Sequence, residues 1–247
     1  MAADLLLACA GVSVGYDERP VLEGVDLEIR RGEIVVMLGG SGCGKSTLLR
    51  ALTGLLPPFA GTVTLLGEDL YAHDEEARRK LLRRTGVAFQ QDALFSGISV
   101  IDNVALPLRE LTRLPETLIC EMARIKLALV GLSGFELRAP ANLSGGQRKR
   151  AALARASILD PEIIFCDEPS AGLDPVVAAG LDDTLLHFRD ALGVTIVVVT
   201  HELASIRAIA DRAIMFGGGG VMATGTVDEL EHSADEGVYN FFHARAS

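Results

Sequence analysis

The sequence predicts an α/β fold with a mainly parallel sheet, antiparallel strands near the N-terminus and an inserted helical segment. Three observations favour this fold class. Short apolar strands alternate with helical stretches, the pattern of a parallel sheet covered on both faces. A glycine-rich loop, Gly39–Thr47, lies between an expected strand and an expected helix. A mainly helical stretch over residues 91–160 separates two β-rich segments.

The individual elements are expected from apolar runs and from the glycine and proline residues between them. The expected strands are Leu5–Val14, Val25–Ile29, Glu33–Leu38, Thr62–Leu66, Val87–Phe89, Ile163–Cys166 and Val194–Thr200, with a hairpin turning at Gly217–Gly220. The expected helical stretches are Ser46–Leu55, Glu75–Arg84, Ile101–Leu132, Gly145–Ile158 and Val176–Leu192. We expect one domain, with a core of residues 1–90 and 161–230, a helical subdomain of residues 91–160, and a C-terminal helix or tail of residues 231–247.

Charge and hydropathy exclude several classes of function. The net charge of −10 argues against nucleic-acid binding, which normally needs a basic face. No apolar run approaches the roughly 18 residues of a membrane-spanning helix. Residues 1–4 lack the positive charge of a secretory signal, so we expect a soluble chain that meets a membrane through a partner. The four cysteines show neither CxxC pairing nor metal-ligand spacing and are expected to be free thiols.

The glycine-rich loop carries the clearest chemical pattern. Gly39-Gly40-Ser41-Gly42-Cys43-Gly44-Lys45-Ser46 satisfies the phosphate-loop (P-loop) pattern GxxxxGK[ST], and Thr47 follows it. Glycines let successive backbone N–H groups face a phosphate, and the following helix adds partial positive charge at its N-terminus. The pattern assigns Lys45 to the β- and γ-phosphates of a nucleotide and Ser46 to Mg²⁺. The alternative is a glycine-rich turn that only ends a strand.

A second pattern is an apolar strand that ends in two carboxylates, Asp167 and Glu168. After a P-loop, adjacent acids at the end of a strand indicate two roles. Asp167 is expected to hold Mg²⁺, directly or through water, and Glu168 to act as general base on the attacking water. Taken alone, the same residues describe a strand that runs into a solvated turn.

A third pattern, Leu143-Ser144-Gly145-Gly146-Gln147, is called the signature loop below. Ser144 is expected to cap a helix whose first turn holds the two glycines, and such a helix start is itself an anion site. The loop has no lysine of its own. The sequence therefore predicts a second phosphate-binding loop that closes over a nucleotide held elsewhere.

The P-loop, the signature loop and the Asp-Glu pair, in this order, resemble the ATP-binding subunit of ABC transporters over essentially the whole chain. The resemblance implies a P-loop NTPase (ABC ATPase) core that hydrolyses ATP with Mg²⁺. It also implies that Tyr16 stacks on adenine, that Asp174 lies on a loop crossing a dimer interface and that His201 contacts the γ-phosphate. Gln90 is similar to the glutamine that senses Mg²⁺ and the attacking water, with Gln91 as the alternative register.

The resemblance further implies a homodimer in which each P-loop faces the partner's signature loop, so that Ser144, Gly145, Gly146 and Gln147 act on the opposite ATP. The other implied partners are an integral membrane permease and, through it, a substrate-binding or Mce-type protein, with no nucleic acid. This places the chain at the cytoplasmic face of the inner membrane. The stretch Gln91–Val100 is the expected docking surface, and ordinary packing between core and helical insert is its alternative.

Two short segments bear on the substrate. Ala93–Val100 and Asn103–Glu110 resemble the ATPases of Mla- and Mce-type lipid transport systems, which implies a phospholipid or other hydrophobic substrate. The alternative is the ATPase of an amino-acid or other small-solute importer, which has the same catalytic motifs. A soluble non-transport ABC ATPase is disfavoured because the chain has neither two cassettes nor a long coiled-coil insertion. A P-loop kinase or GTPase would leave the signature loop unexplained.

The free position in the P-loop is occupied by Cys43. A thiol near a helix N-terminus can be reactive. We expect alkylation of Cys43 to block ATPase activity and prior ATP binding to protect it; the alternative is an unreactive small residue in the packing.

Overall fold

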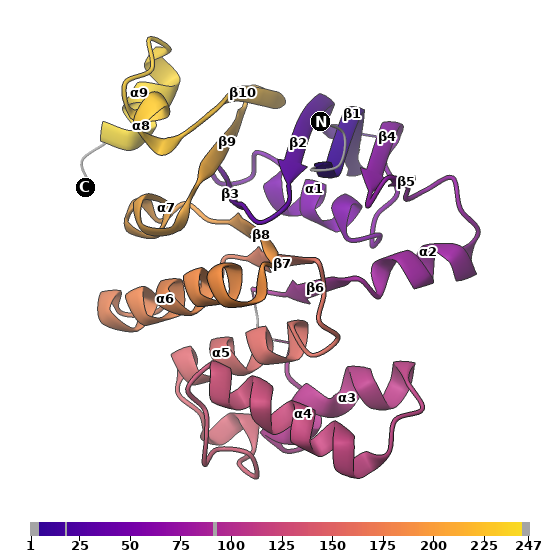
Figure 1. Ribbon diagram of the computed structural model, residues 1–247. Coiled ribbons are helices and arrows are strands. Elements are labelled where there is room, and N and C mark those ends of the chain that lie inside the picture. Colours follow the sequence, from indigo (N-terminus) through magenta and orange to yellow (C-terminus); the bar gives the residue numbers. More distant parts are fainter. Residues whose placement is uncertain (1–4, 18, 91–92, 244–247) are drawn as a thin grey trace.

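The computed structural model describes residues 5–17, 19–90 and 93–243. It contains two sheets, with helix α1 (Lys45–Leu52) in contact with both (Figure 1). The first sheet is antiparallel, in the order β2-β1-β4-β5. Its strands are β1 (Leu5–Tyr16), β2 (Arg19–Arg30), β4 (Ala60–Leu65) and β5 (Glu68–Asp69).

The second sheet has the order β10-β9-β3-β8-β7-β6, and its neighbours are parallel except for the hairpin β9–β10. Its strands are β3 (Ile34–Gly39), β6 (Thr85–Ala88), β7 (Ile163–Asp167), β8 (Thr195–Val199), β9 (Arg212–Gly217) and β10 (Gly220–Gly225). The predicted α/β class, with a mainly parallel sheet and antiparallel N-terminal strands, is confirmed.

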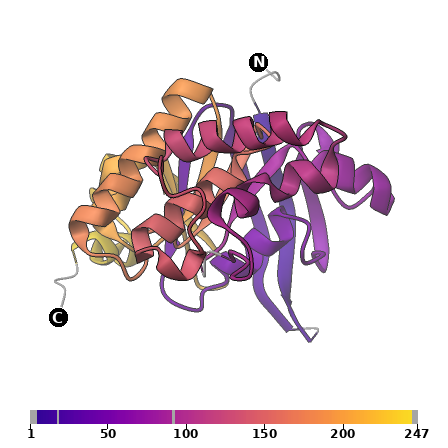
Figure 2. The same cartoon turned by 90° about the horizontal axis from the view of Figure 1, so that it is seen from below.

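The remaining helices are α2 (Glu75–Leu82), α3 (Val100–Leu111), α4 (Glu116–Leu129), α5 (Gly145–Ala156), α6 (Pro175–Leu192), α7 (Leu203–Ile209), α8 (Val227–Glu231) and α9 (Glu236–His243). Helices α3, α4 and α5 pack on one another and lie in front of the strands when the molecule is seen from below (Figure 2). The stretch expected to be mainly helical over Ile101–Leu132 is two helices, because the chain is extended at Thr112 and Pro115. No helix of the described ranges is long and apolar enough to cross a bilayer.

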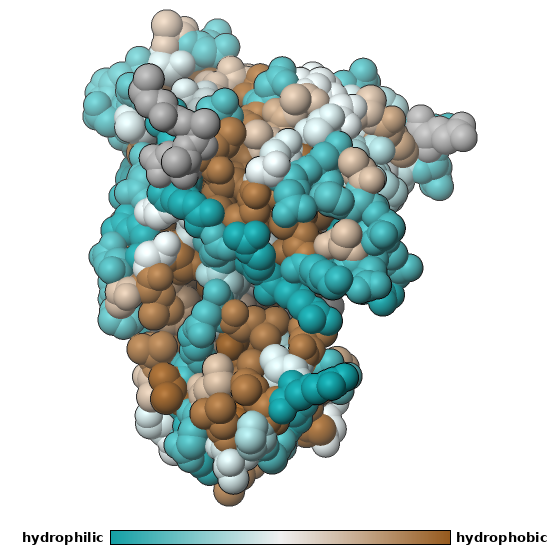
Figure 3. Space-filling view, turned by 45° about the vertical axis from the view of Figure 1, so that its right-hand side comes forward, coloured by the Kyte–Doolittle hydropathy of each residue, from teal (hydrophilic) through white to brown (hydrophobic). Residues whose placement is uncertain are grey.

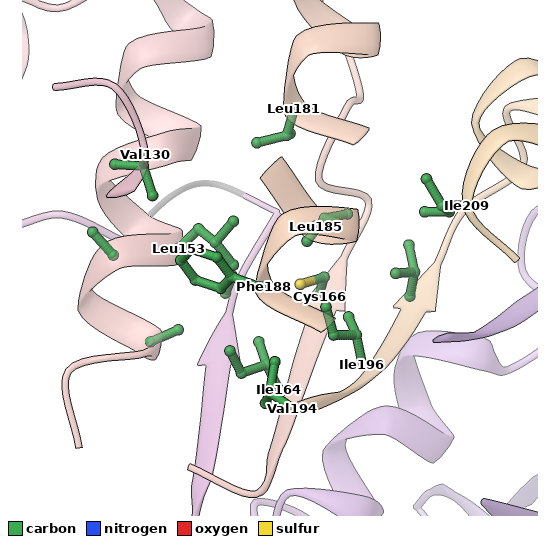
Figure 4. Packing of buried hydrophobic residues seen from close by; sticks show 14 of the residues in the cluster. Val130, Leu153, Ile164, Cys166, Leu181, Leu185, Phe188, Val194, Ile196 and Ile209 are labelled. Carbon is green, nitrogen blue, oxygen red and sulfur yellow. The ribbon is translucent and has the colours of Figure 1, made fainter. Parts of the chain in front are cut away.

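The central strands bury both faces, as a parallel sheet between two layers requires. On β3, Val35 and Met37 face the core shared with α1 and the antiparallel sheet, while Val36 and Leu38 face the opposite core. Figure 4 shows part of that opposite core, where Phe188 of α6 and Leu153 of α5 lie together beside the strands. Because β3, β6, β7, β8 and β9 are parallel, their carboxyl ends lie at one edge of the sheet, where the candidate site lies.

A buried carboxyl group joins α6 to α7. Asp182 is only 6% exposed, and the hydroxyl of Ser205 donates a 2.8 Å hydrogen bond to it. Burial, reinforced by the negative charges of Glu202 and Asp183, raises the pKa of Asp182 from its ordinary value of 3.8 to about 6, against the opposing effect of the Ser205 hydrogen bond.

This raised pKa predicts a stability that depends on pH. Ionisation of Asp182 is harder in the folded state than in the unfolded state. The protonated carboxyl group therefore makes its full contribution to the free energy of unfolding below the unfolded pKa, and this contribution is lost as pH rises through about 6. We expect Asp182→Asn to stabilise the protein at pH 8 by up to about 3 kcal/mol, and to have little effect near pH 4. Urea unfolding of both proteins at the two pH values measures this difference; equal differences at both would contradict it.

Candidate functional site

The P-loop has a backbone that only glycine allows at two positions. Gly39 has a φ of +142°, and a Cβ there would lie 2.3 Å from the carbonyl oxygen of Phe216 on β9. Gly44 has a φ of +101°, and its Cβ would lie 2.6 Å from a side-chain carbon of Leu22. The neighbouring strands thus hold the loop tightly, and α1 begins at the next residue, Lys45.

Lys45 folds back over this loop. Its ammonium group donates hydrogen bonds of 2.8 Å to the carbonyl of Gly39 and 3.0 Å to that of Gly40, and it lies 3.5 Å from the thiol of Cys43. Only 7% of Lys45 is exposed. The positive charge of Lys45 is therefore held at the P-loop, where the pattern assigns it to the phosphates of a nucleotide.

Cys43 behaves differently from the rest of the loop. Its side chain is partly buried and packs against the core between the two sheets, and it does not line the cleft that the other loop residues form. This geometry favours the alternative in which Cys43 is a small packing residue. Alkylation would then act by disturbing the loop and Lys45, not by covering the cleft.

The two carboxylates at the end of β7 have separate surroundings. Oδ1 of Asp167 accepts a 3.1 Å hydrogen bond from Oγ of Ser46. Burial raises the pKa of Asp167, while the Ser46 hydrogen bond and the nearby positive charges of Arg50 and Lys45 act in the opposite direction.

Glu168 is strained and incompletely satisfied. Its φ of +47° lies in the left-handed region, and its N–H donates a 2.8 Å hydrogen bond to the carbonyl of Val199. The side chain is 13% exposed, and Oε1 lies 2.9 Å from Nδ1 of His201. Oε2 is buried and has no hydrogen-bond partner among the residues that the structure describes. Strained backbone and an orphaned buried oxygen both occur preferentially at functional sites.

Except for Cys43 and Asp167, these groups line one cleft of about 1030 Å³, large enough for a nucleotide, and Asp167 is joined to the cleft by its hydrogen bond with Ser46. The predicted site residues that line it are Tyr16, Gly39, Gly40, Ser41, Gly42, Gly44, Lys45, Ser46, Thr47, Gln90, Glu168 and His201. Three further lining residues, Val21, Leu203 and Phe241, had not been predicted. Val21 lies on a strand and Phe241 on the last helix, and neither belongs to a local motif.

Two of the predicted lining residues, Tyr16 and Gln90, come from near the ends of β1 and β6. Tyr16, at the end of β1, is 43% exposed, and the guanidinium of Arg50 donates a hydrogen bond to its hydroxyl. Gln90 follows β6, and its carbonyl accepts a hydrogen bond from the ammonium of Lys149 on α5. Gln91, the alternative register for Gln90, lies outside the described residues.

The signature loop has the local structure that its sequence predicts. Ser144 caps α5 by accepting a 3.3 Å hydrogen bond from the N–H of Gln147, whose side chain in turn accepts a 2.9 Å bond from the N–H of Ser144. Ser144 is exposed, Gly145 is half-buried and Gly146 is buried.

Asp174 similarly caps α6, accepting hydrogen bonds of 3.2 and 3.1 Å from the N–H groups of Val176 and Val177. Neither Asp174 nor any residue from Ser144 to Gln147 lines the nucleotide-sized cleft. One chain therefore brings together the P-loop, Asp-Glu and His201 parts of the predicted site but not the signature loop.

The strand-loop-helix around Lys45, the acids at the end of β7 and the cleft beside them define a P-loop NTPase. The family model described as ABC transporter matches residues 22–171. The chain belongs to the ABC transporter family, as an ATP-binding subunit that hydrolyses ATP.

The curated relatives include two intermembrane phospholipid transport system ATP-binding proteins named MlaF. The chain is 39% identical to that of Haemophilus influenzae over 91% of its own length and 85% of the relative's. It is 38% identical to the MlaF protein of Escherichia coli K12, over 93% of its own length and 86% of the relative's. It is also 42% identical to the probable ribonucleotide transport ATP-binding protein mkl of Mycobacterium tuberculosis H37Rv, but it spans only 56% of that protein's length.

Solved structures of the same kind superpose closely. The cbiO1 protein of Clostridium perfringens, part of an ABC transporter complex, gives a TM-score of 0.84 at 30% identity, covering 92% of this chain and 90% of that one. An ATP-binding cassette solved as a dimer in a post-hydrolysis state with ADP and Pi gives a TM-score of 0.81 at 30% identity. This match covers 90% of this chain and 98% of the cassette.

Proposed function

We propose that two copies of this chain close on ATP and that its hydrolysis drives a separate membrane permease carrying phospholipid or another hydrophobic substrate. The observation that carries the dimer is the division of the site. The P-loop, Glu168 and His201 line the cleft, while the signature loop, with Ser144 exposed, lies apart from it in the same chain. A partner copy placed head to tail would supply the missing loop, and a similar cassette solved as a dimer supports pairing of two copies.

Within that dimer each predicted residue has a role that its surroundings support. Lys45 and the P-loop amides hold the phosphates, Tyr16 stacks on adenine, and Gln90 and His201 flank the γ-phosphate. Glu168 takes the proton of the attacking water. The stretch of residues 91–160, with α3, α4 and α5, acts as a subdomain that carries the signature loop over the partner's nucleotide.

The residues present also fit Mg²⁺. This ion prefers oxygen ligands in octahedral geometry at about 2.0–2.1 Å, which puts adjacent ligands about 3 Å apart. Oγ of Ser46 and Oδ1 of Asp167 lie 3.1 Å apart beside the cleft. We propose that these two oxygens hold the ion, with Gln90 nearby, and that the bound ion neutralises charge on the transferred phosphate.

Lys45→Ala tests the nucleotide site. Each hydrogen bond from a charged group is worth roughly 1.5–3 kcal/mol, so ATP affinity is expected to fall by roughly 10- to 150-fold. Isothermal titration with ATP and Mg²⁺ measures the change. Lys80→Ala is the control, because Lys80 is exposed on α2 and pairs only with Glu76 among the ion pairs of the described residues. Equal affinities for both variants would contradict the assignment.

The proposal for the permease is supported by exposed apolar residues next to the site and by the names of the MlaF relatives. Phe89, Phe95 and Ile98 are exposed to 39%, 57% and 36% where the core meets the helical layer. Figure 3 shows hydrophobic residues gathered over the lower, helical part of the molecule. With the permease bound, the chain would lie at the cytoplasmic face of the inner membrane.

Purification from detergent-solubilised membranes tests this proposal. We expect Phe95→Ser to release the permease. Met222→Ser should retain it, because Met222 is 42% exposed on β10, at the opposite edge of the second sheet from β6 and Phe89. Mass spectrometry of the complex should find co-purified phospholipid. A bound amino acid, nucleotide or other small solute would favour the importer alternative, and a complex with ribosomes or nucleic acid would overturn the transport proposal.

A further inference from the structure

The signature loop and the start of α6 are in unusually close contact within one chain. Gly146, the second residue of α5, is buried. A Cβ built on Gly146 would lie 2.2 Å from Cγ1 of Val177 and 3.7 Å from its Cβ. Since carbon atoms that are not bonded do not approach so closely, a methyl group of Val177 already fills the place of a side chain at position 146.

The backbone gives no reason for glycine at position 146. Gly146 is not among the residues with positive φ, and it lies in a helix, where any residue except proline adopts the conformation. Alanine is normally the more stable choice at such a position. Two reasons for glycine remain, namely space for the partner's nucleotide and space for Val177.

Two further close approaches lie beside this contact between α5 and α6. A Cβ on Gly145 would lie 3.3 Å from Cδ2 of Leu173, the residue before Asp174. A Cβ on Gly180, one turn beyond Val177, would lie 2.6 Å from Nη2 of Arg150. The signature loop therefore rests on the Asp174 loop and on the first turns of α6.

We propose that Val177 is a positioning residue, which occupies the side-chain place of Gly146 and so joins the signature loop to the Asp174 loop as one rigid unit. The inference rests on the proposed dimer, in which the signature loop acts on the partner's ATP. Because Asp174 caps α6 through the N–H of Val177 itself, a displacement of the Asp174 loop is transmitted to Gly146 by direct contact. The two loops then reach the partner together.

A double substitution tests the contact. Gly146→Ala is expected to lower the Tm, the opposite of the usual effect of this change in a helix, and to lower kcat. The affinity of its own P-loop for a fluorescent ADP analogue should stay at the wild-type value, since Lys45 and the cleft are unaffected. In Gly146→Ala/Val177→Ala, Tm and kcat should both return to those of Val177→Ala alone.

The neighbouring residue provides a matched control. Val176 is chemically identical to Val177 but 82% exposed, so Val176→Ala should not rescue Gly146→Ala. Rescue by both alanines, or a Tm of Gly146→Ala at or above wild type, would overturn the proposal. If the double variant recovered its Tm but not its kcat, the proposal would also be overturned, because the glycine would then be needed to leave space for the partner's nucleotide. The proposed dimer is tested separately: if it is wrong, the wild-type protein will stay monomeric in the presence of ATP.

Discussion

Glu168→Gln is expected to bind ATP but to hydrolyse it at least about 100-fold more slowly than the wild type, the usual contribution of a general base. Glutamine keeps the shape of the side chain and can still contact Nδ1 of His201, which lies 2.9 Å from Oε1 in the wild type. It cannot accept the proton of the attacking water. With hydrolysis blocked, the ATP-bound dimer should accumulate.

Single-turnover hydrolysis and size-exclusion chromatography with ATP and Mg²⁺ measure these two effects. Glu202→Gln is the matched control, because Glu202 follows His201 directly but does not line the cleft. Normal hydrolysis by Glu168→Gln would show that another group is the base. Loss of ATP binding would show that Glu168 holds the nucleotide instead of acting on water.

Ser144→Asp is expected to lower the ATPase rate by roughly 10³-fold or more, the scale of a stabilising group supplied by a partner in related phosphoryl transfer. Aspartate is as good an N-cap as serine, so α5 should still form. Its negative charge would face the γ-phosphate of the partner's ATP. Thr226→Asp places the same charge at the N-cap of α8, which also has a capping box, and should leave the rate unchanged.

Mixing two inactive variants shows which chain the signature loop serves. Ser144→Asp has an intact P-loop, and Lys45→Ala has an intact signature loop. In a mixed dimer these two meet and form one complete site, so the mixture should hydrolyse ATP faster than either parent. If the loop served its own chain, the mixture would show only the average of the parents.

Much of this site could be predicted because its motifs are local. The P-loop needs glycines and a lysine at fixed spacing, and the observed φ values of Gly39 and Gly44 show why that spacing leaves little freedom. The Asp-Glu pair was found from an apolar strand that ends in acids. The capping of α5 by Ser144 and Gln147 likewise depends only on neighbours in the sequence.

Other features arise only from tertiary contacts. Phe241 and Leu203 line the cleft because α7 and α9 pack near it, and neither residue has a pattern that marks it. The left-handed backbone of Glu168 depends on its hydrogen bond to the neighbouring strand. The inward packing of the Cys43 thiol depends on the core beneath the loop, so the local sequence does not distinguish a reactive thiol from a packing residue.

The wall of the cleft has a consequence for protein synthesis. Tyr16 comes from the first strand, whereas Phe241 comes from the last helix. Because chains are made from the N-terminus and their parts fold as they emerge, the P-loop can form long before its surroundings are complete. A nascent chain would hold a phosphate loop with one side of its cleft open. Tight nucleotide binding would begin only once residue 241 has left the ribosome, so two chains still short of that residue would not yet pair on ATP.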